Sequence, residues 1–293
     1  MTKVFVLGNC QVGGIADALR LLKPGVKLER YVVTHEGKSL VSDLKNFRNR
    51  DFDVAIVHES VSASLADQSG LVEQLAPRVL KLPSLTFSAF HPDIVYAFHN
   101  NQVVKNGLNS DWNSRIILLS YLEGFSEKDT LSLFNSTVFD SLGYFTVWSS
   151  SASELAESFA RCDLDFSRWI RRVQRQGVFM YGINHPAQFA LCELAAQIAE
   201  GIDNQPSDVV ADLPRLTKDY LAHIVWPVYP EIAKRLGLDG SYHWRVGDDF
   251  ANLDQFVERC YWSWNKARIT SLSLNFVPTV SPETIKTLQS SLS

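Results

Sequence analysis

Three polar residues that can take part in chemistry follow the first apolar run of the chain: Asn9, Cys10 and Gln11. A cysteine at a helix N-terminus can have its thiol pKa lowered from about 8.5 towards neutrality, and the thiolate is the nucleophile. The two amide side chains can contact a ligand beside it. The triplet predicts a nucleophilic or ligand-binding site centred on Cys10. A small residue that packs a tight turn is the alternative explanation for Cys10.

Two common phosphate-binding motifs do not fit this stretch. Gly8 and Gly13 have the spacing of a P-loop, but Gly14 and Ile15 stand where that motif needs Lys and Ser or Thr. A dinucleotide-binding turn needs glycine at the position of Cys10. Cys10 is therefore interpreted as a nucleophile or as a contact to a ligand.

A second polar cluster, His91-Pro92-Asp93, lies between apolar residues. Pro92 disfavours a helical conformation for His91, so the segment is expected to be extended or turning. His91 and Asp93 could orient a substrate or pair with a base. Alternatively, Asp93 only caps a local turn.

A third cluster is Asn184-His185-Pro186. Pro186 is well placed as the first residue of a helix, which puts His185 at a helix N-terminus. The helix dipole disfavours the imidazolium there, and a neutral histidine is what a general base requires. His185 could instead be a surface residue that caps the helix.

Four arginines, Arg168, Arg171, Arg172 and Arg175, have the spacing of one face of a helix. Guanidinium groups pair with phosphates in a bidentate manner, so this face could bind a polyanion. A solvated basic face is the other interpretation.

Strand and helix patterns alternate over the first 100 residues, which predicts a parallel sheet with right-handed crossovers. Strands are expected at 3–7, 26–34, 53–57 and 79–82, with helices from Ile15, around 38–49 and at 64–76. The ligand-facing carboxyl ends of these strands would carry Gly8-Asn9-Cys10 and His58-Glu59-Ser60. His58 and Glu59 either belong to the site or cap the next helix.

Helical patterns dominate after residue 100. They cover 127–140, 151–161, 166–176, 186–200, 214–224, 228–236 and 252–267. The predicted fold is α/β: an N-terminal parallel sheet with flanking helices, followed by a mostly helical C-terminal half packed on the sheet edge. The predicted division is 1–100, carrying Gly8 to Gln11, and 101–293, carrying Asn184 to Pro186.

Composition excludes several classes of protein. A net charge of −4 argues against general nucleic-acid binding, which favours a basic surface. No apolar run approaches the roughly 20 residues of a membrane span. A strand that starts at Lys3 leaves no room for a signal peptide, so a cytoplasmic location is expected. The four cysteines show no pairing typical of disulfides or structural zinc, and no metal site is predicted.

The order of the three motifs, Gly8-Asn9-Cys10-Gln11, His91-Pro92-Asp93 and Asn184-His185-Pro186, resembles that of the WcbI family of polysaccharide biosynthesis enzymes. The resemblance covers about residues 3–200 and weakens afterwards. It implies an acetyltransferase of capsule assembly that uses coenzyme A or acetyl-CoA as co-substrate and a saccharide hydroxyl as acceptor.

The resemblance also implies roles for the candidate residues. Cys10 would be the nucleophile or would line the thioester site, His185 or His91 would be the base, and Asp93 could orient the histidine. Main-chain N–H groups near residues 10–11, with Asn9 or Asn184, would stabilise the oxyanion. The predicted coenzyme A contacts are Asn9, Gln11, Asn184 and the four arginines. A direct transfer, in which the histidine deprotonates the sugar and Cys10 only contacts the ligand, fits the same residues.

Two other functions remain open from the sequence. The strand–turn–helix entry to Cys10 resembles the nucleophile site of SGNH esterases with Cys in place of Ser, which would make the protein a hydrolase. The other possibility is a non-catalytic protein that binds coenzyme A or sugar. The acceptor sugar, the acyl group and the oligomeric state are not specified by the sequence.

Overall fold

We describe a computed structural model of the chain, in which residues 1–33, 44, 51–64, 70–162, 164–203, 205, 212–270 and 274–292 are placed. Contacts divide the chain into two compact units. The first unit comprises Met1–Thr86, Ala152–Met180 and Asn184–Ala222. The second comprises Phe87–Ser151, Tyr181–Ile183 and His223–Ser293. This division differs from a boundary at residue 100, because two later segments belong to the same unit as the N-terminal sheet.

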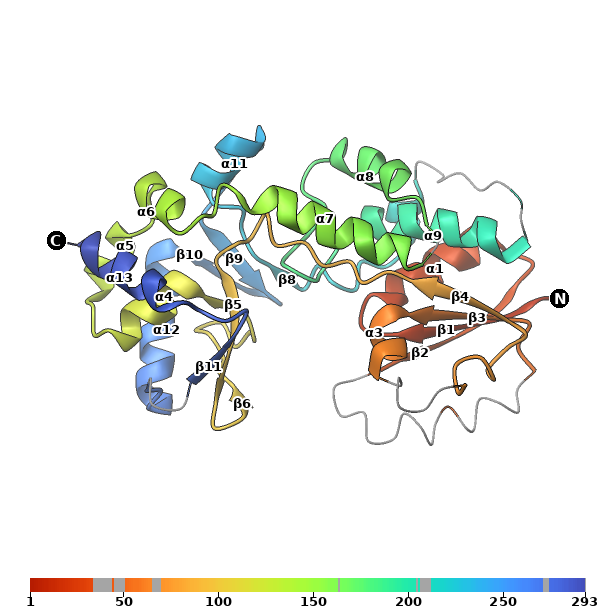
Figure 1. Cartoon of the computed structure of the whole chain (residues 1–293), viewed down its shortest axis with the longest axis horizontal. Coiled ribbons are helices and arrows are strands. Elements are labelled where there is room, and N and C mark those ends of the chain that lie inside the picture. The colour runs from red at the N-terminus through yellow and green to blue at the C-terminus, as the bar shows by residue number, and fades with distance from the viewer. Residues whose placement is uncertain are drawn as a thin grey trace. The chain divides into compact units, whose positions relative to one another are not determined.

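The first unit is built on a four-stranded parallel sheet in the order β2-β1-β3-β4 (Figure 1). Its strands are β1 (Lys3–Gly8), β2 (Lys27–Val32), β3 (Val54–His58) and β4 (Arg78–Leu82). Its helices are α1 (Val12–Leu22), α3 (Glu59–Ser64), α8 (Phe166–Gln174), α9 (Gln188–Asp203) and α10 (Leu213–Leu216), and α7 (Val147–Ala160) enters the unit at Ala152. The expected N-terminal parallel sheet is confirmed.

The two central strands of the sheet, β1 and β3, are buried on both faces, as their unbroken apolar runs predict. Phe5 and Leu7 of β1 belong to a core cluster with Ala55 and Val57 of β3 and with Val61 of α3. The alternate strand residues point to the opposite face, because successive side chains of a strand alternate. That second series is also buried, and it comprises Val4, Val6, Val54 and Ile56.

Helices from the C-terminal half complete this unit. α9 packs along α1, and the amide of Gln188 donates to the carbonyl of Gly14 at 3.1 Å. The other end of α9 reaches the edge strand β4, where Arg78 donates to the carbonyl of Ile202 at 3.2 Å. α8 packs on α9 through the buried Trp169, whose indole N–H donates to the carbonyl of Ala190. Helical packing at the sheet edge is therefore confirmed.

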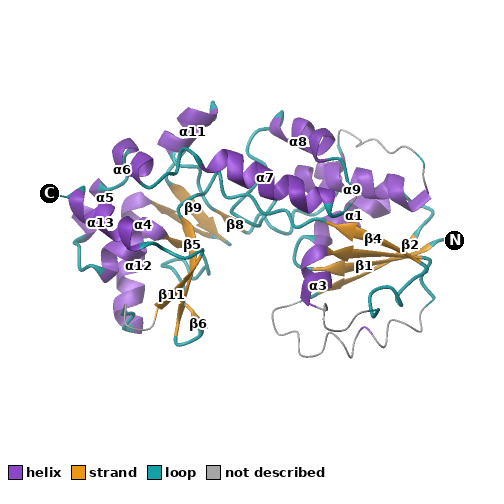
Figure 2. Ribbon diagram, viewed as in Figure 1, coloured by secondary structure: helices purple, strands orange, loops and turns teal. Residues whose placement is uncertain are grey.

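The second unit mixes short antiparallel strands with helices (Figure 2). Its strands are β5 (Ile94–His99), β6 (Gln102–Val103), β7 (Asn113–Ser114), β8 (Ile224–Val225), β9 (His243–Val246), β10 (Asp249–Asn252) and β11 (Leu274–Val277). Its helices are α4 (Arg115–Leu122), α5 (Glu127–Ser132), α6 (Ser136–Ser141), α11 (Pro230–Leu236), α12 (Leu253–Ala267) and α13 (Pro282–Ser290), with the first residues of α7.

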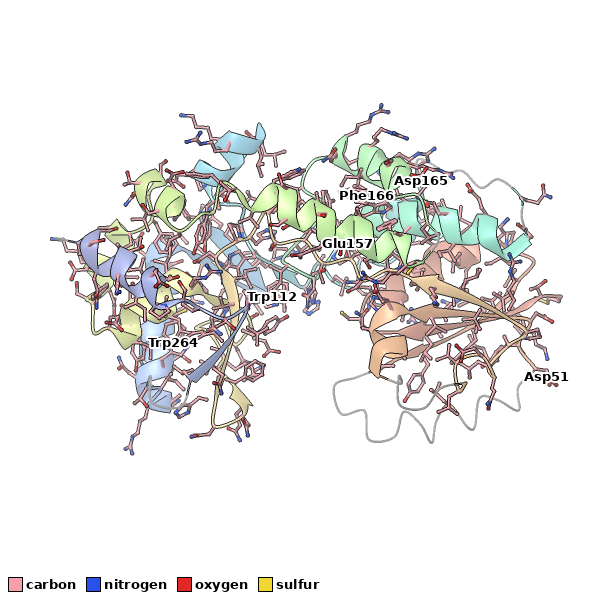
Figure 3. The ribbon with its side chains drawn as sticks, viewed as in Figure 1. Asp51, Trp112, Glu157, Asp165, Phe166 and Trp264 are labelled. Carbon is pink, nitrogen blue, oxygen red and sulfur yellow. The ribbon has the colours of Figure 1, made fainter. Side chains whose placement is uncertain are left out.

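Buried tryptophans anchor this second unit. The indole N–H of Trp112 donates to the hydroxyl of Tyr96 and that of Trp264 donates to the carbonyl of Lys105, both at 2.8 Å. Both tryptophans are labelled in Figure 3. Trp244 stacks on Phe256 with ring centroids 4.4 Å apart. The aromatic residues of the C-terminal quarter therefore serve mainly as core, as buried aromatic side chains usually do.

Some predicted helices are wrong in their bounds. The helix expected at 64–76 does not continue through residues 70–75, which form turns; Gly70 there has φ +95°. The helix expected at 127–140 is interrupted, because Asn135 caps a new helix, α6. The helix expected at 214–224 is a single turn, α10. The helix expected at 38–49 lies outside the described residues, apart from Leu44.

Candidate functional site

The residues Asn9, Cys10 and Gln11 form the turn between β1 and α1. The side-chain oxygen of Asn9 accepts a hydrogen bond from the N–H of Gln11 at 3.0 Å, and the carbonyl of Asn9 accepts from Val12 at 3.2 Å. α1 begins at Val12, so Cys10 precedes the helix by two residues. The local polar side chain thus stabilises the turn that presents Cys10.

This turn lies at a topological switch point of the sheet. β1 has β2 on one side and β3 on the other, so the chain leaves β1 in one direction and continues on the other side of it. In open parallel sheets, ligands bind at the carboxyl ends of the strands at such a point. The two strand ends that meet here are those of Gly8 and His58, since Leu7 pairs with Val57.

Gln11 joins this turn to two distant segments. Its side chain is 1% exposed, and its amide nitrogen donates to the carbonyls of Leu85 at 3.0 Å and Asn184 at 3.1 Å. Its amide oxygen accepts from the N–H of Leu85 at 3.4 Å. Gln11 thereby places the first motif beside the third within one compact unit. Because its amide bonds to the main chain on both ends, Gln11 positions these segments.

The thiol of Cys10 is exposed, whereas Cys162, Cys192 and Cys260 are buried. Desolvation by the surrounding protein raises the pKa of the Cys10 thiol, and the main-chain N–H of Cys10 only partly offsets this. The expected lowering of the pKa is therefore wrong. The helix begins too late to stabilise the thiolate as predicted, and nearby protein atoms replace water around it.

The segment Asn184-His185-Pro186 enters α9 differently from the prediction. Pro186 is not the first helical residue; it pairs with Met180 in an isolated β-bridge, and α9 begins at Gln188. The first N–H of α9 donates to the carboxylate of Asp219 at 3.3 Å. His185 is half-buried beside Asn184. That His185 and Cys10 share one pocket stays a prediction, but their chain neighbours, Asn184 and Gln11, are in hydrogen-bond contact.

His91 and Asp93 belong to the second unit and have different environments. Burial lowers the pKa of His91 to about 3, with a small opposing contribution from the main chain of Trp226. The carboxylate of Asp93 accepts hydrogen bonds from other groups. At Oδ1 they come from the hydroxyl of Tyr144 at 2.7 Å and the N–H of Ile116 at 3.1 Å, and at Oδ2 from the hydroxyl of Tyr229 at 2.7 Å.

Asp93 therefore anchors the start of α4 and two buried tyrosines. Both of its oxygens have partners other than a histidine, so these contacts do not support the role of orienting a catalytic base. Burial, followed by the charge of Asp93, raises the pKa values of Tyr144 and Tyr229. Both tyrosines remain hydrogen-bond donors to the carboxylate.

The four arginines divide into two pairs. Arg168 donates to both oxygens of Glu200 at 2.8 and 2.6 Å, and Arg172 donates to Glu193 at 3.2 Å, so both bind α9. Arg171 and Arg175 are exposed. Asp165, labelled with Phe166 in Figure 3, caps α8 by accepting from the N–H of Arg168 at 2.9 Å. Only Arg171 and Arg175 keep the solvent exposure that an added polyanion requires.

His58 ends β3 and Glu59 begins α3. His58 is fully buried, and burial lowers its pKa to about 4. Glu59 accepts from the hydroxyl of Ser158 at 2.6 Å and pairs with Arg161, which ties the start of α3 to the end of α7. The sequence leaves open whether His58 belongs to the site or caps the next helix, and it assigns His58 no catalytic or binding role. Its place at a strand end next to Gly8 is the sequence signal for it.

A cavity of about 390 Å³ lies between β4, α8 and α9. Its lining includes Lys81, Cys162, Arg168, Gln197 and Glu200. Among the residues that line it, none comes from the Cys10 turn or from Asn184-His185-Pro186. The two charged groups Arg168 and Glu200 bind each other, so the cavity offers a ligand no free ionic partner from this pair.

Comparisons with known proteins give one family. The family model described as polysaccharide biosynthesis enzyme WcbI matches residues 3–207. The match spans the whole parallel sheet, all three motifs and α9. No curated protein matches the chain.

No helix among the described residues is long and apolar enough to cross a membrane. Within the same residues, no group of three or more His, Cys, Asp or Glu side chains could hold a metal ion.

Proposed function

This chain belongs to the WcbI family of polysaccharide biosynthesis enzymes, and on that basis we propose that it transfers an acyl group from coenzyme A to a saccharide hydroxyl. The acyl group is an acetyl group, as the resemblance to capsule enzymes suggests. Acetyl-CoA is the donor, and a sugar of the growing polysaccharide or its precursor is the acceptor. The capsule is the expected product of such a pathway, and the cytoplasm, where acetyl-CoA is made, is the expected location.

The observation that carries this proposal is the pair of hydrogen bonds from Gln11 to Leu85 and Asn184. They bring an exposed cysteine and a histidine motif to the carboxyl edge of one parallel sheet, although 173 positions separate Gln11 from Asn184. A nucleophile and a base must lie within hydrogen-bond reach, or one water apart, for acyl transfer. The fold supports such an arrangement of Cys10 and His185.

Because the pKa of the Cys10 thiol is raised, the proposed reaction needs His185 as a base. A thiol that is mostly protonated at neutral pH needs a base to become a nucleophile. In the proposed reaction His185 accepts the thiol proton and Cys10 attacks the thioester carbonyl. The sulfur–carbon bond to coenzyme A then breaks, and coenzyme A leaves as a thiol that takes the proton from His185. The sugar hydroxyl next attacks the acyl-cysteine while His185 accepts the hydroxyl proton. The sulfur–carbon bond to Cys10 breaks, the sugar ester is released, and His185 returns the proton to the Cys10 thiolate. In a direct transfer, His185 deprotonates the sugar hydroxyl and Cys10 only lines the thioester site.

Asn9 and Asn184 are the side-chain amides proposed near the developing oxyanion. The main-chain N–H of Gln11 is a weaker candidate than predicted, because it already donates to Asn9. Arg171 and Arg175 are proposed as contacts to the phosphates of coenzyme A. The burial of His91 and the buried hydrogen bonds of Asp93 support structural roles for these two residues, so His185 is the proposed base.

Hydrolysis is a second candidate, and the exposure of Cys10 favours it, since water reaches the thiol. A hydrolase would release acetate from acetyl-CoA without any sugar. A transferase would release coenzyme A slowly until an acceptor hydroxyl is added. A protein that only binds would be stabilised by acetyl-CoA without releasing coenzyme A.

Thermal shift and coenzyme A release together test the proposal. A specific ligand at 100 times its dissociation constant adds about 2.7 kcal/mol to the free energy of unfolding. His185→Ala should lower turnover by roughly 10²–10⁴-fold, as expected for loss of a general base, with little change in stability. His243→Ala, which changes an exposed histidine of β9, is the matched control. Unchanged turnover in His185→Ala would remove His185 from the mechanism.

A further inference from the structure

His58 occupies the end of β3 at the switch point of the sheet. It follows the buried series Val54 and Ile56, which points away from the face of Phe5 and Leu7. Gly8 of β1 lies on this same face. A Cβ atom at position 8 would be 2.5 Å from the Cβ of His58 and 2.5 Å from a methyl group of Val12 in α1. The absence of a side chain at Gly8 thus lets His58 lie directly against the turn that presents Cys10.

The two ring nitrogens of His58 differ. Nδ1 accepts from the N–H of Ser60 at 3.2 Å and lies 2.8 Å from the hydroxyl of Ser60. An acceptor carries no proton, so the neutral ring is protonated at Nε2. Burial lowers the pKa of His58 to about 4, which keeps the ring neutral at pH 7 and preserves the Nε2–H donor.

That donor is buried and makes no hydrogen bond within the described part of the chain. His58 has no exposed surface, so bulk water does not compensate. Leaving a buried donor unpaired costs about 1–3 kcal/mol. Among the described residues, Ser60 fixes the tautomer and nothing accepts from Nε2–H, on a side chain that lies against the turn that presents Cys10. This donor is therefore available to an acceptor that arrives from outside.

We infer that the Nε2–H of His58 donates a hydrogen bond to the carbonyl oxygen of the acyl group bound at Cys10, and stabilises the oxyanion that forms there. The inference deepens the proposed acyl transfer and rests on its assignment of Cys10. The group that accepts the hydrogen bond is the acyl carbonyl oxygen, which becomes an alkoxide when the sulfur of Cys10 attacks the carbonyl carbon. A neutral imidazole suits this task, because it donates without becoming charged.

The rate of acetylation of Cys10 by p-nitrophenyl acetate tests the inference without coenzyme A or sugar. The thiolate attacks the acetyl carbonyl to give an oxyanion, the carbon–oxygen bond breaks, p-nitrophenolate leaves, and Cys10 carries a thioester. Alkylation of Cys10 by iodoacetamide is the internal reference, because that displacement forms no oxyanion. The ratio of the two rates in one variant cancels changes in the exposure or pKa of the thiol.

His58→Asn keeps an acceptor in place of Nδ1 but has no group where Nε2 was. We expect it to reduce the acetylation-to-alkylation ratio by about 10²-fold, the effect of losing one oxyanion donor. His58→Gln returns an amide to the Nε2 position and should restore part of the ratio. Ser60→Ala, the matched control, removes one partner of Nδ1 and should leave the ratio near that of the unchanged protein. An unchanged ratio in His58→Asn overturns the inference.

Ring nitrogen NMR of the unchanged protein gives a second readout that needs no variant to fold. The inference requires the Nε2–H tautomer of His58 and a shift of this proton signal when Cys10 is acetylated. The Nδ1–H tautomer, or a signal that does not move, overturns it. The proposed function fails separately, if acetyl-CoA neither stabilises the protein nor reacts while p-nitrophenyl acetate still shows the dependence on His58.

Discussion

At the scale of single residues, the candidate site depends on one thiol that is accessible but poorly ionised. Cys10 is exposed, yet the protein around it raises its pKa. Its reactivity at pH 7 therefore has to come from a neighbouring base and from access to reagents rather than from a stable thiolate. In the proposed reaction, this combination would restrain side reactions until a ligand and a base are both in place.

We predict that limited iodoacetamide labelling modifies Cys10 before Cys162, Cys192 or Cys260, because the other three thiols are buried. Burial also raises the pKa of Cys192 to about 11 and that of Cys260 to about 12. Peptide mapping by mass spectrometry identifies the labelled residue, and Cys10→Ser gives the background. Earlier labelling of any other cysteine would contradict the exposed position of Cys10.

The same reaction has a predictable pH dependence. A raised pKa means a smaller thiolate fraction at every pH below it, so the labelling rate of Cys10 should still increase where a free cysteine derivative has levelled off. The midpoint of the pH–rate profile should thus lie above that of the free thiol. A midpoint below it would restore the original expectation of a thiolate stabilised by the helix.

Gln11 gives a prediction about stability. Gln11→Ala leaves the N–H and carbonyl of Leu85 and the carbonyl of Asn184 without their amide partner. The free energy of unfolding should fall by about 2 kcal/mol, within the range for buried groups that lose a hydrogen bond. Urea denaturation measures this. Arg20→Ala on the exposed side of α1 is the control, with a change of about 0.5 kcal/mol or less.

The sequence predicts where Asn9, Cys10 and Gln11 lie, but not which contacts they make or how the pKa of Cys10 shifts. The run from Lys3 to Gly8 predicts a strand, and the strand places Asn9, Cys10 and Gln11 at its carboxyl end. The partners of Gln11, however, are 74 and 173 positions away, so its role as a connector has no local signal. The pKa of Cys10 also depends on distant atoms, because desolvation is a property of the packed structure.

At the scale of elements, α8 shows how packing against a neighbouring helix separates residues that share one helix face. The spacing of the four arginines predicts one basic face, but Glu193 and Glu200 of α9 bind two of them. The spacing on one helix contains no information about the charges on its neighbour. For the same reason the short strands of the second unit, such as β6 and β8, were not predicted: two residues carry too little periodicity.

The two arginine pairs should respond differently to mutation. Arg171→Ala with Arg175→Ala should weaken acetyl-CoA binding by about 100-fold or more while changing stability little, since charge-assisted phosphate contacts contribute about 1.5–3 kcal/mol each. Arg168→Ala should instead lower the free energy of unfolding by about 1 kcal/mol, because it breaks a half-exposed bidentate pair. Calorimetric titration and urea denaturation separate the two effects.

Equal affinity for acetyl-CoA in the Arg171→Ala, Arg175→Ala double variant would return these residues to a solvated basic face. Lower affinity in Arg168→Ala at unchanged stability would show that the ion pair with Glu200 opens to bind the ligand.

At the scale of the whole molecule, a change at Asp93 tests whether the two units can be perturbed separately. It is buried in the second unit, where it accepts three hydrogen bonds. Asp93→Ala should lower the free energy of unfolding by about 3 kcal/mol, as expected when a buried hydrogen-bonded charge is removed from its partners. Differential scanning calorimetry measures the loss, and the labelling rate of Cys10 below the transition should stay unchanged. Lost turnover at full stability would instead make Asp93 part of the catalytic machinery.

The interleaving of the two units along the chain has a consequence for synthesis on the ribosome. All four strands of the parallel sheet have been made by residue 82, but the unit that contains them is complete only at residue 222. At 5–20 residues per second, the wait is roughly 7 to 28 s. During that interval α9 has not yet packed on the unit that contains the sheet. Most of the chain made between β4 and α9 belongs to the second unit or to α7 and α8. A nascent chain of this design would expose apolar strands long enough for a chaperone to bind them.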